Sequence, residues 1–399
     1  LGKNSKTEMV NNILHFLSFL EKENCIVVYT PAIPKDSEEL NFFLNNNFKT
    51  LKRATVLGEI TKSTFCLAAA GTHGKTTTSS ILGHIMQPEK ATSFLGGIAE
   101  NYQSNLILGD DKITVVEADE FDRSFLQLSP NIACVTSMDA DHLDIYGDAL
   151  SIEASFLEFS KKVTGTLIVA KGLPLAGLTY AVNEAADFTA YNLKIVDGTY
   201  FFDVKTPTGT IRDMSLHLPG KHNVMNALAA IAMANIYGVS LDKIKQQLAT
   251  FNGVKRRFSY KIKSANLVLI DDYAHHPTEI NAVEDSIREM YPDQKVLAVF
   301  QPHLFSRTKD FVLDFASALS KFDEVLLLDI YPAREAPIAN VTSSWLLSKI
   351  QTKNKKVVQK NDVIEYIEAS SCKVIAMMGA GDIGHLINDV ASQLLKSVK

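Results

Sequence analysis

The sequence predicts an α/β protein built from parallel β-sheets and helices. Short apolar runs that end in small or acidic residues alternate with helix-like segments along all 399 residues. Such runs are typical of strands buried on both faces, and their alternation with helices indicates layered parallel sheets. The clearest runs are CIVVYT, FCLAAAGT, ITVVEADE, IACVTSMD, LVLIDDYA, VLAVFQP, VLLLDIYP and KVIAMMGAG.

The length indicates two to four domains rather than a single core. We place three units, at residues 1–64, 65–252 and 253–399. The middle unit is expected to end in an Ala-rich helix over 223–237 and a short following helix. Within it, residues 172–219 are richer in Thr, Gly and Tyr, which predicts β-structure there.

Composition and charge exclude several classes of protein. The formal net charge of -5 argues against a general nucleic-acid binder, which would show a basic excess. The four cysteines are scattered and form no CxxC pair, so they indicate neither a disulfide framework nor a zinc site. No apolar run reaches the length of a membrane span, and the polar N-terminus lacks a signal-peptide core. We therefore expect a cytoplasmic protein with no membrane partner.

The segment FCLAAAGTHGKTTTSSILGHIM predicts a strand, a phosphate-binding loop and a helix. Small residues let backbone N–H groups surround phosphate oxygens, and the helix N-terminus adds partial positive charge. Lys75 would reach the β- and γ-phosphates, and the Thr76 hydroxyl would meet Mg²⁺. Ala69 replaces the first glycine of the usual pattern. The candidate nucleotide-binding residues of the loop are Gly71, Thr72, His73, Gly74, Lys75, Thr76 and Thr77.

The loop alone leaves other readings open. A Gly-rich turn that binds nothing is one, and a mechanical ATPase is another. A switch GTPase would need a base-reading NKxD motif, which the sequence lacks.

Acidic residues follow two further predicted strands. TVVEADEFDRSF places Glu117, Asp119, Glu120 and Asp122 at one strand end, and SMDADHLDIYGD places Asp139, Asp141, His142 and Asp144 at another. Parallel neighbouring strands would bring both clusters to the rim that holds the phosphate loop. Carboxylates with one imidazole suit Mg²⁺ bound to phosphate, so Thr76, Glu117 and His142 are the candidate metal ligands. For Asp119, Glu120 and Asp144, a role as helix caps or solvated acids is equally plausible.

A second glycine pattern predicts a rival chemistry. VIAMMGAGDIGHL contains Gly379, Gly381 and Gly384 in the G-x-G-x-x-G spacing of dinucleotide-binding loops, which would indicate an NAD-dependent enzyme. That fingerprint requires a second strand with an acidic residue about 20 residues on, beyond Lys399. We expect this loop only to tighten a strand-to-helix turn.

The segments GTHGKTTT, EADEFDRSFLQLSP and TSMDADHLDIYGD together resemble the central domain of the Mur ligases of peptidoglycan synthesis, and within them the branch that adds L-alanine. The resemblance implies a three-domain architecture. A Rossmann-like N-terminal domain at 1–64, apparently incomplete, would bind the UDP-sugar, with the family's first Gly-rich loop preceding Leu1. A central P-loop ATPase-like domain would occupy 65–252. A C-terminal Rossmann-like domain at 253–399 would contribute to ATP and amino-acid binding.

The resemblance also implies roles for residues around the nucleotide. GKHNVMNALAAIAMA is similar to a family helix in which Asn223 and Asn226 would bind adenine, although both could instead cap that helix. In GVKRRFSY, Arg257, with Arg256 nearby, would reach the nucleotide phosphates. In LVLIDDYAHHPTEI, Asp272 would hold the ribose hydroxyls.

Substrate contacts are expected from two strand-end loops. His275, with His276 beside it, would position the substrate, and His303 and Arg307 of FQPHLFSRT would face the acyl phosphate and the amino acid. Leu304 departs from the family pattern, in which some members have a basic residue there.

The resemblance implies ATP- and Mg²⁺-dependent ligation of L-alanine to the lactyl carboxylate of UDP-N-acetylmuramate through an acyl phosphate. The residues expected to act in catalysis are Lys75, Glu117, His142 and Arg307. We expect a monomer or a weak homodimer. The alternatives are a ligase that recycles an intact tripeptide and a P-loop ATPase of another class.

Overall fold

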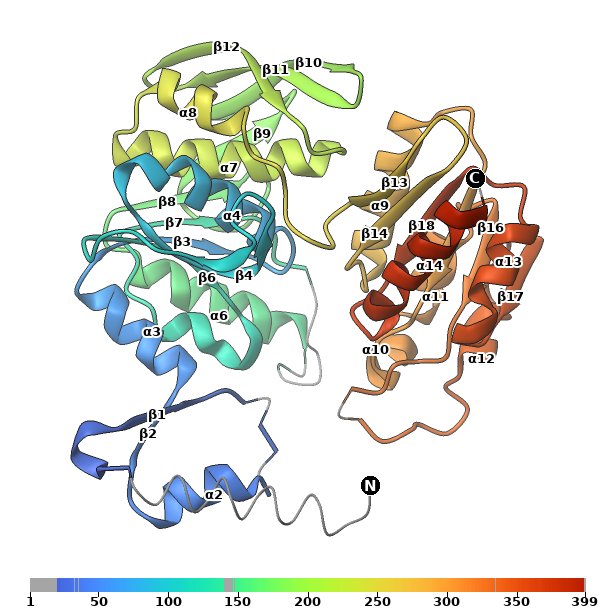
Figure 1. Ribbon diagram of the computed structural model, residues 1–399. Coiled ribbons are helices and arrows are strands. Elements are labelled where there is room, and N and C mark those ends of the chain that lie inside the picture. The colour runs from blue at the N-terminus through green and yellow to red at the C-terminus, as the bar shows by residue number, and fades with distance from the viewer. Residues whose placement is uncertain are drawn as a thin grey trace.

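The computed structural model of the protein describes residues 20–31, 33–34, 36–139, 146, 148–333 and 335–397. Three separate sheets organise these residues, and the parts of the chain that form them are set apart in space (Figure 1). The part with the first sheet lies at one end of the middle part, and the C-terminal part lies beside the middle part.

The first sheet is small. Strands β1 (Ile26–Tyr29) and β2 (Lys49–Lys52) pair in parallel. Between them lies helix α2 (Glu38–Asn45), whose first turn is capped by the side chain of Ser37. Helix α3 (Arg53–Lys62) then leads into the middle sheet.

The middle sheet has ten strands in the order β12-β11-β10-β9-β8-β7-β3-β6-β4-β5. It is parallel from β10 to β4 and antiparallel at both edges. The β-structure predicted for 172–219 is confirmed by β9 to β12. The strands are β3 (Phe65–Ala70), β4 (Thr92–Ala99), β5 (Ser104–Ile107), β6 (Ile113–Ala118), β7 (Ile132–Val135), β8 (Thr166–Ala170), β9 (Leu178–Val182), β10 (Phe188–Val196), β11 (Thr199–Thr206) and β12 (Gly209–Leu216).

Helices cover both faces of this sheet. Alternate residues of β3 point to opposite sides, so Leu67 packs in one core with α4 and α7, and Ala68 packs in another with α6. Figure 1 shows α4, α7 and α8 on one face and α3 and α6 on the other. The predicted Ala-rich helix and its short successor are confirmed. The helices are α4 (Lys75–Ile85), α6 (Ala149–Lys162), α7 (Lys221–Tyr237) and α8 (Leu241–Leu248).

The C-terminal sheet has six strands in the order β13-β14-β18-β15-β16-β17, parallel except for β13. Helices α9, α11 and α12 pack on one face, and α13 and α14 pack on the other. The strands are β13 (Ser259–Lys263), β14 (Val268–Asp272), β15 (Val296–Phe300), β16 (Glu324–Leu327), β17 (Asn354–Val357) and β18 (Val374–Met378). The helices are α9 (Pro277–Met290), α10 (Phe305–Asp310), α11 (Val312–Leu319), α12 (Ser343–Leu347), α13 (Val363–Ala369) and α14 (Ile383–Ser397).

All eight apolar runs predicted as strands are strands, each paired in parallel with at least one neighbour. The short 3-10 segments are η1 (Lys22–Asn24), η2 (Gln87–Glu89), η3 (Phe121–Gln127) and η4 (Lys360–Asp362).

The second glycine pattern has a packing role in this fold. It follows β18, which lies inside the C-terminal sheet between β14 and β15. A Cβ at Gly384 would lie 2.5 Å from Cζ of Arg256, and one at Gly381 would lie 2.4 Å from Oε1 of Gln301. These glycines let two side chains approach the strand-to-helix turn.

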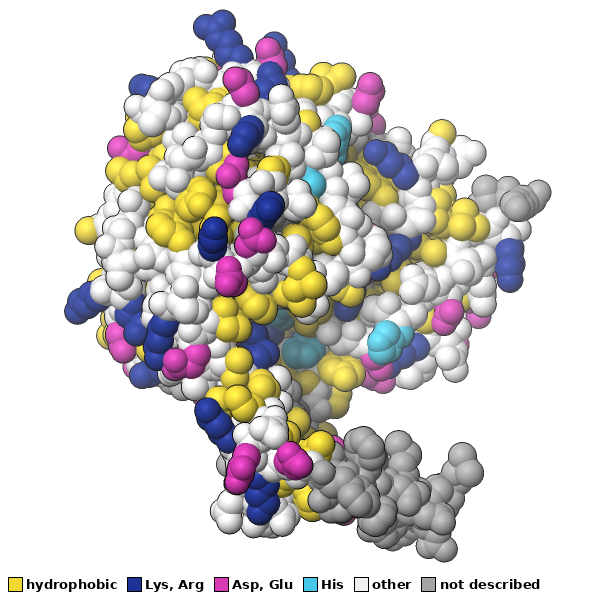
Figure 2. Space-filling model, turned by 60° about the vertical axis from the view of Figure 1, so that its left-hand side comes forward, with side chains coloured by type: hydrophobic (Ala, Val, Ile, Leu, Met, Phe, Trp, Pro, Cys, Tyr) yellow, Lys and Arg dark blue, Asp and Glu magenta, His cyan; other side chains and the backbone are white. Residues whose placement is uncertain are grey.

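The surface matches the balanced composition. Acidic and basic side chains are interspersed on the face shown in Figure 2. Within the described ranges, none of the helices combines the length and the apolarity that a membrane crossing requires.

Candidate active site

The phosphate loop joins β3 to α4 at the carboxyl edge of the middle sheet. Gly74 adopts a left-handed conformation with φ 84° directly before the first residue of α4. A Cβ at this position would lie 2.3 Å from Oδ1 of Asn226 on α7, so both the backbone angle and the space require glycine. Ala69 is fully buried in β3, before the loop begins.

Hydroxyl side chains after β7 hold the loop from behind. Ser137 Oγ accepts a hydrogen bond from the backbone N–H of His73 at 2.8 Å and lies 2.8 Å from Oγ1 of Thr72. The Thr136 hydroxyl donates to the backbone carbonyls of Ala70, at 3.1 Å, and of His73. These bonds fix the loop backbone through β7, the strand beside β3.

Thr76 and Glu117 face each other at the base of the loop. The Thr76 hydroxyl donates to Oε1 of Glu117 at 3.0 Å, and the backbone N–H of Gly96 donates to Oε2 at 2.9 Å. A hydroxyl and a carboxylate side by side are oxygen ligands of the kind that Mg²⁺ prefers. The third predicted ligand, His142, lies outside the described residues, as do Asp141 and Asp144. Within the described part of the chain, no group of three or more His, Cys, Asp or Glu side chains is arranged as a metal site.

Lys75 forms a buried ion pair with Glu120. Its Nζ lies 2.6 Å from Oε2 of Glu120, which is 1% exposed, and it also donates to the backbone carbonyl of Gly71 at 2.8 Å. Burial lowers the pKa of Lys75, but the charges of Glu120, Asp119 and Glu117 outweigh it and raise the pKa, so the ammonium form persists. Burial raises the pKa of Glu120 to about 7.

Asn223 and Asn226 lie buried in the first turns of α7. The amide of Asn223 donates to the backbone carbonyl of Pro219 at 2.6 Å, and the amide of Asn226 donates to Oδ1 of Asn223 at 3.3 Å. The N-cap residue of α7 is Gly220, so no side chain caps the start of this helix. Neither asparagine is therefore the cap residue that the alternative interpretation required.

The two arginines of the RR pair have different positions. Arg256 lies 3.3 Å from Oδ1 of Asp271 and donates to the backbone carbonyl of Gly379, so it holds the C-terminal unit together. Arg257 faces the cavity, with its guanidinium 5.1 Å from the ring centre of Tyr273. Only Arg257 is placed to meet a ligand there.

Asp272 ends β14 with both carboxylate oxygens engaged. They accept hydrogen bonds from the backbone N–H groups of Phe258 at 2.6 Å and Ala274 at 2.7 Å. Burial raises the pKa of Asp272 to about 6, against the opposing effect of the Arg257 charge. The carboxylate is held rigidly at the cavity wall.

The two histidines that follow β14 have different positions. His276 is the cap of α9, and its Nδ1 accepts from the backbone N–H of Thr278 at 3.4 Å. His275 lines the cavity, and its ring lies 5.9 Å from that of His303. Arg307, on α10, is 6% exposed. Among the described residues, neither His303 nor Arg307 lines this cavity.

The cavity lies between the middle and C-terminal units and has a volume of about 480 Å³. The middle unit contributes the phosphate loop, Glu117, Asn223 and Asn226, and the C-terminal unit contributes Arg257, Asp272 and His275. Of the predicted site residues in the described ranges, only Gly71, His303 and Arg307 are absent from its lining. A chamber of this size and composition suits a nucleotide.

Comparison with known proteins decides the family. The model of the Mur ligase middle domain matches residues 69–234, and that of the Mur ligase glutamate ligase domain matches residues 256–383. The chain belongs to the Mur ligase family.

Curated relatives and solved structures agree with this placement. The UDP-N-acetylmuramate–L-alanine ligase of Flavobacterium psychrophilum is 60% identical over 376 residues, which cover 93% of this chain and 84% of the relative. The corresponding enzyme of Parabacteroides distasonis is 45% identical, covering 96% and 86%. The crystal structure of UDP-N-acetylmuramate–alanine ligase from Thermotoga maritima matches with a TM-score of 0.79 and 26% identity, covering 94% of this chain and 87% of that one.

Several residues of this Mur ligase site were not predicted. Ser137 and Thr136 were passed over, although hydroxyls directly after the run IACV were a usable signal. Glu120, for which a solvated position was equally plausible, is buried against Lys75. Tyr273 and Glu279 also line the cavity, and nothing local in the sequence distinguishes them from ordinary strand-end and helix-start residues.

Proposed function

We propose that this Mur ligase joins L-alanine to the lactyl carboxylate of UDP-N-acetylmuramate, with ATP converted to ADP and phosphate. Its curated relatives named for that reaction are 42–60% identical over most of the chain. The tripeptide-recycling alternative has weaker support, because the murein peptide ligase of Psychrobacter arcticus is 23% identical and shows the fold alone.

One observation of the site supports the proposal most. The cavity joins the phosphate loop and the Thr76–Glu117 pair of one unit to Arg257 and Asp272 of another. A phosphoryl-transfer site needs cations and a metal site around the phosphates, and catalysis there is mostly positioning and charge stabilisation. A cavity closed by two units also shields a reactive acyl phosphate from water.

Mg²⁺ fits the oxygen ligands at the base of the loop. We propose that the Thr76 hydroxyl and the Glu117 carboxylate hold it, with His142 as the third protein ligand. The ion would neutralise charge on the phosphate oxygens.

In the first step, a lactyl carboxylate oxygen attacks the γ-phosphorus of ATP. The new P–O bond forms as the bond to the β-phosphate oxygen breaks, which yields an acyl phosphate and ADP. Lys75 and Arg257 balance the negative charge of the transferring group, and Asn226 and Asp272 hold the adenosine.

In the second step, the uncharged amine of alanine attacks the acyl carbon. The tetrahedral intermediate expels phosphate, the nitrogen gives a proton to the departing phosphate, and the amide remains. Arg307, His303 and His275 are proposed to bind the acyl phosphate and the amino acid. The contact between the rings of His303 and His275, of which His275 lines the cavity, supports this part of the proposal.

We also propose which reactant each of the three units binds. Residues 1–64 would bind the UDP-sugar, 65–252 would bind ATP, and 253–399 would complete the ATP site and bind the amino acid. The reaction is expected in the cytoplasm, by a monomer or a weak homodimer.

The test is ADP release with ATP, Mg²⁺, UDP-N-acetylmuramate and L-alanine, each omitted in turn. Release that requires all four supports the ligase. Release that requires a tripeptide in place of alanine would assign the chain to the recycling reaction, and release that needs neither sugar nucleotide nor amine would leave an ATPase of another class.

A further inference from the structure

Glu279 lies at the start of α9, where it contacts both sides of the cavity. Its Oε2 accepts hydrogen bonds from the backbone N–H groups of His275 at 2.9 Å and His276 at 3.2 Å. The bond from His276 forms half of a capping box that fixes the beginning of the helix. A capping role accounts for one carboxylate oxygen and leaves the other to be explained.

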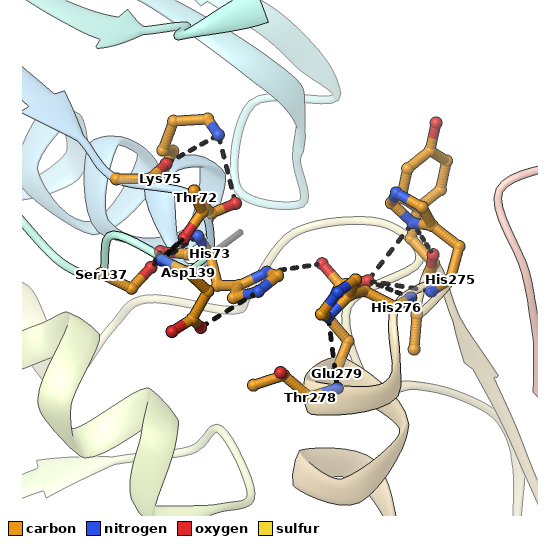
Figure 3. Close-up of polar contacts among 12 residues, drawn as sticks. Thr72, His73, Lys75, Ser137, Asp139, His275, His276, Thr278 and Glu279 are labelled. Atoms are coloured by element: carbon orange, nitrogen blue, oxygen red, sulfur yellow. Dashed lines mark hydrogen bonds and ion pairs between the residues drawn. The ribbon is translucent and has the colours of Figure 1, made fainter. Parts of the chain in front are cut away.

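The other oxygen reaches across the cavity to the phosphate loop. Oε1 of Glu279 lies 3.5 Å from Nδ1 of His73. On its other edge, Nε2 of His73 lies 3.3 Å from Oδ2 of Asp139, so the ring is held between two carboxylates from different units (Figure 3). The His276 ring packs against it with centres 5.0 Å apart.

His73 is inside the loop that would surround the phosphates, between Thr72 and Gly74. Its backbone is fixed to Ser137 of the middle unit. Its side chain, 14% exposed, is directed to the C-terminal unit, as Figure 3 shows. A shift of α9 relative to the middle sheet would therefore act directly on the phosphate loop.

Glu279 also lies beside a histidine of its own unit, whose Nδ1 is in addition 2.9 Å from the backbone carbonyl oxygen of Tyr273. Nδ1 of His275 lies 3.3 Å from Oε2 of Glu279, and His275 lines the cavity beside His303. Burial raises the pKa of Glu279, but the opposing effects of His275, His73 and Arg257 are larger. The pKa of Glu279 is therefore well below its usual range. The group is a carboxylate at neutral pH.

We propose that Glu279 is a positioning residue that sets the phosphate loop, through His73, in register with the substrate-side histidine His275. This inference deepens the proposed function and rests on it. Because the loop would align the γ-phosphate and His275 would align the acceptor, the shared carboxylate fixes the distance between the two reactants. Such alignment contributes to the rate of the transfer step more than to the affinity for either substrate.

Charge alone predicts the opposite result for nucleotide binding. A carboxylate that lines a phosphate cavity repels the nucleotide, so its neutralisation would tighten binding and leave turnover unchanged or faster. Positioning predicts slower turnover at saturating substrate. Glu279→Gln separates the two effects, because glutamine can still accept the backbone bonds of the capping box but cannot form the ion pairs.

The experiment is a double-mutant cycle with Glu279→Gln, His73→Ala and the double variant. We expect each single variant to lower kcat about tenfold, with the KM for ATP changed less than about threefold, and the double variant to be no slower than about tenfold. Independent roles would multiply to about a hundredfold. The matched control is Asp285→Asn, an exposed carboxylate on the same helix, which should keep wild-type kcat and show no coupling to His73→Ala.

Equilibrium titration with ADP supplies a second measurement. The fraction of molecules that bind ADP should be the same in each variant as in the wild-type protein. A purely structural defect would instead lower that fraction and leave kcat per binding-competent molecule unchanged. Multiplicative effects on kcat, or unchanged kcat with tighter ADP binding in Glu279→Gln, would overturn the inference. If wild-type protein binds ADP but never turns over, the proposed function fails and not the positioning role alone.

Discussion

The ammonium of Lys75 lies 2.6 Å from the carboxylate of Glu120, a contact between the first residue of α4 and the residue that precedes η3, just after β6. Lys75 also donates to the backbone carbonyls of Gly71 and Thr72. All of these partners are anionic or acceptor groups, and in the proposed function the phosphate oxygens of ATP would take their place. The arrangement keeps a buried cation compensated before ATP arrives.

Replacing Lys75 with Met should reduce kcat by about a thousandfold or more, because a charge on the transferring phosphoryl group loses its partner. Glu120 would then lie buried without its cation, so the Lys75→Met/Glu120→Gln double variant tests whether the loss is merely unfolding. We expect circular dichroism and thermal stability near wild type in the double variant, still without turnover. The exposed Lys90 supplies the control, since Lys90→Met should be fully active.

Replacing Glu117 with Gln should raise the Mg²⁺ concentration needed for half-maximal ADP release by about tenfold or more, because the site loses one anionic oxygen ligand. The hydrogen bonds from Thr76 and Gly96 can still be accepted by the amide oxygen, so the fold should remain. Asp110→Asn, at an exposed loop, should leave the Mg²⁺ dependence as it is. An unchanged dependence in Glu117→Gln would remove Glu117 from the metal site.

The neighbouring arginines should differ in what they do. Arg257→Lys should raise the KM for ATP about tenfold with little change in stability, because the cavity loses a guanidinium fork. Arg256→Lys should lower the thermal midpoint and leave the KM within about twofold, because Arg256 holds Asp271 and the Gly379 carbonyl. Equal effects on the KM for ATP in both variants would contradict the structure, in which Arg257 lines the cavity and Arg256 does not.

His222 makes stability depend on pH. Burial lowers its pKa to about 4, with Arg257 acting in the same direction and Glu289 opposing. As the pH falls, the His222 side chain of the unfolded chain binds a proton near pH 6.5, whereas that of the folded protein binds it only near pH 4. The free energy of unfolding therefore decreases as the pH drops through that window. From pH 7 to pH 5, wild type should lose about 2 kcal/mol more than His222→Asn, measured by urea unfolding. Parallel losses in both proteins would exclude His222 as the cause.

The helices and strands, and the part of the site that lies in the middle unit, could be predicted from local patterns in the sequence. Apolar runs ending in Gly, Asp or Glu are strands because buried parallel strands must be apolar throughout, and the strand–loop–helix signature placed Lys75 and Thr76. Glu117 was predictable because β6 neighbours β3 in the sheet. Contacts between units were not predictable, since the 3.5 Å approach of Glu279 to His73 depends on how two separate sheets dock. Local signals at Glu279 indicate only a helix cap.

The most direct test of the account follows oxygen through the reaction. UDP-N-acetylmuramate labelled with ¹⁸O in its lactyl carboxylate is incubated with ATP, Mg²⁺ and L-alanine, and the released phosphate is analysed by mass spectrometry. An acyl-phosphate ligase transfers one labelled oxygen to phosphate for each amide formed. Phosphate that contains no label, released while ADP accumulates, would show that water attacks ATP and would contradict the proposed ligation.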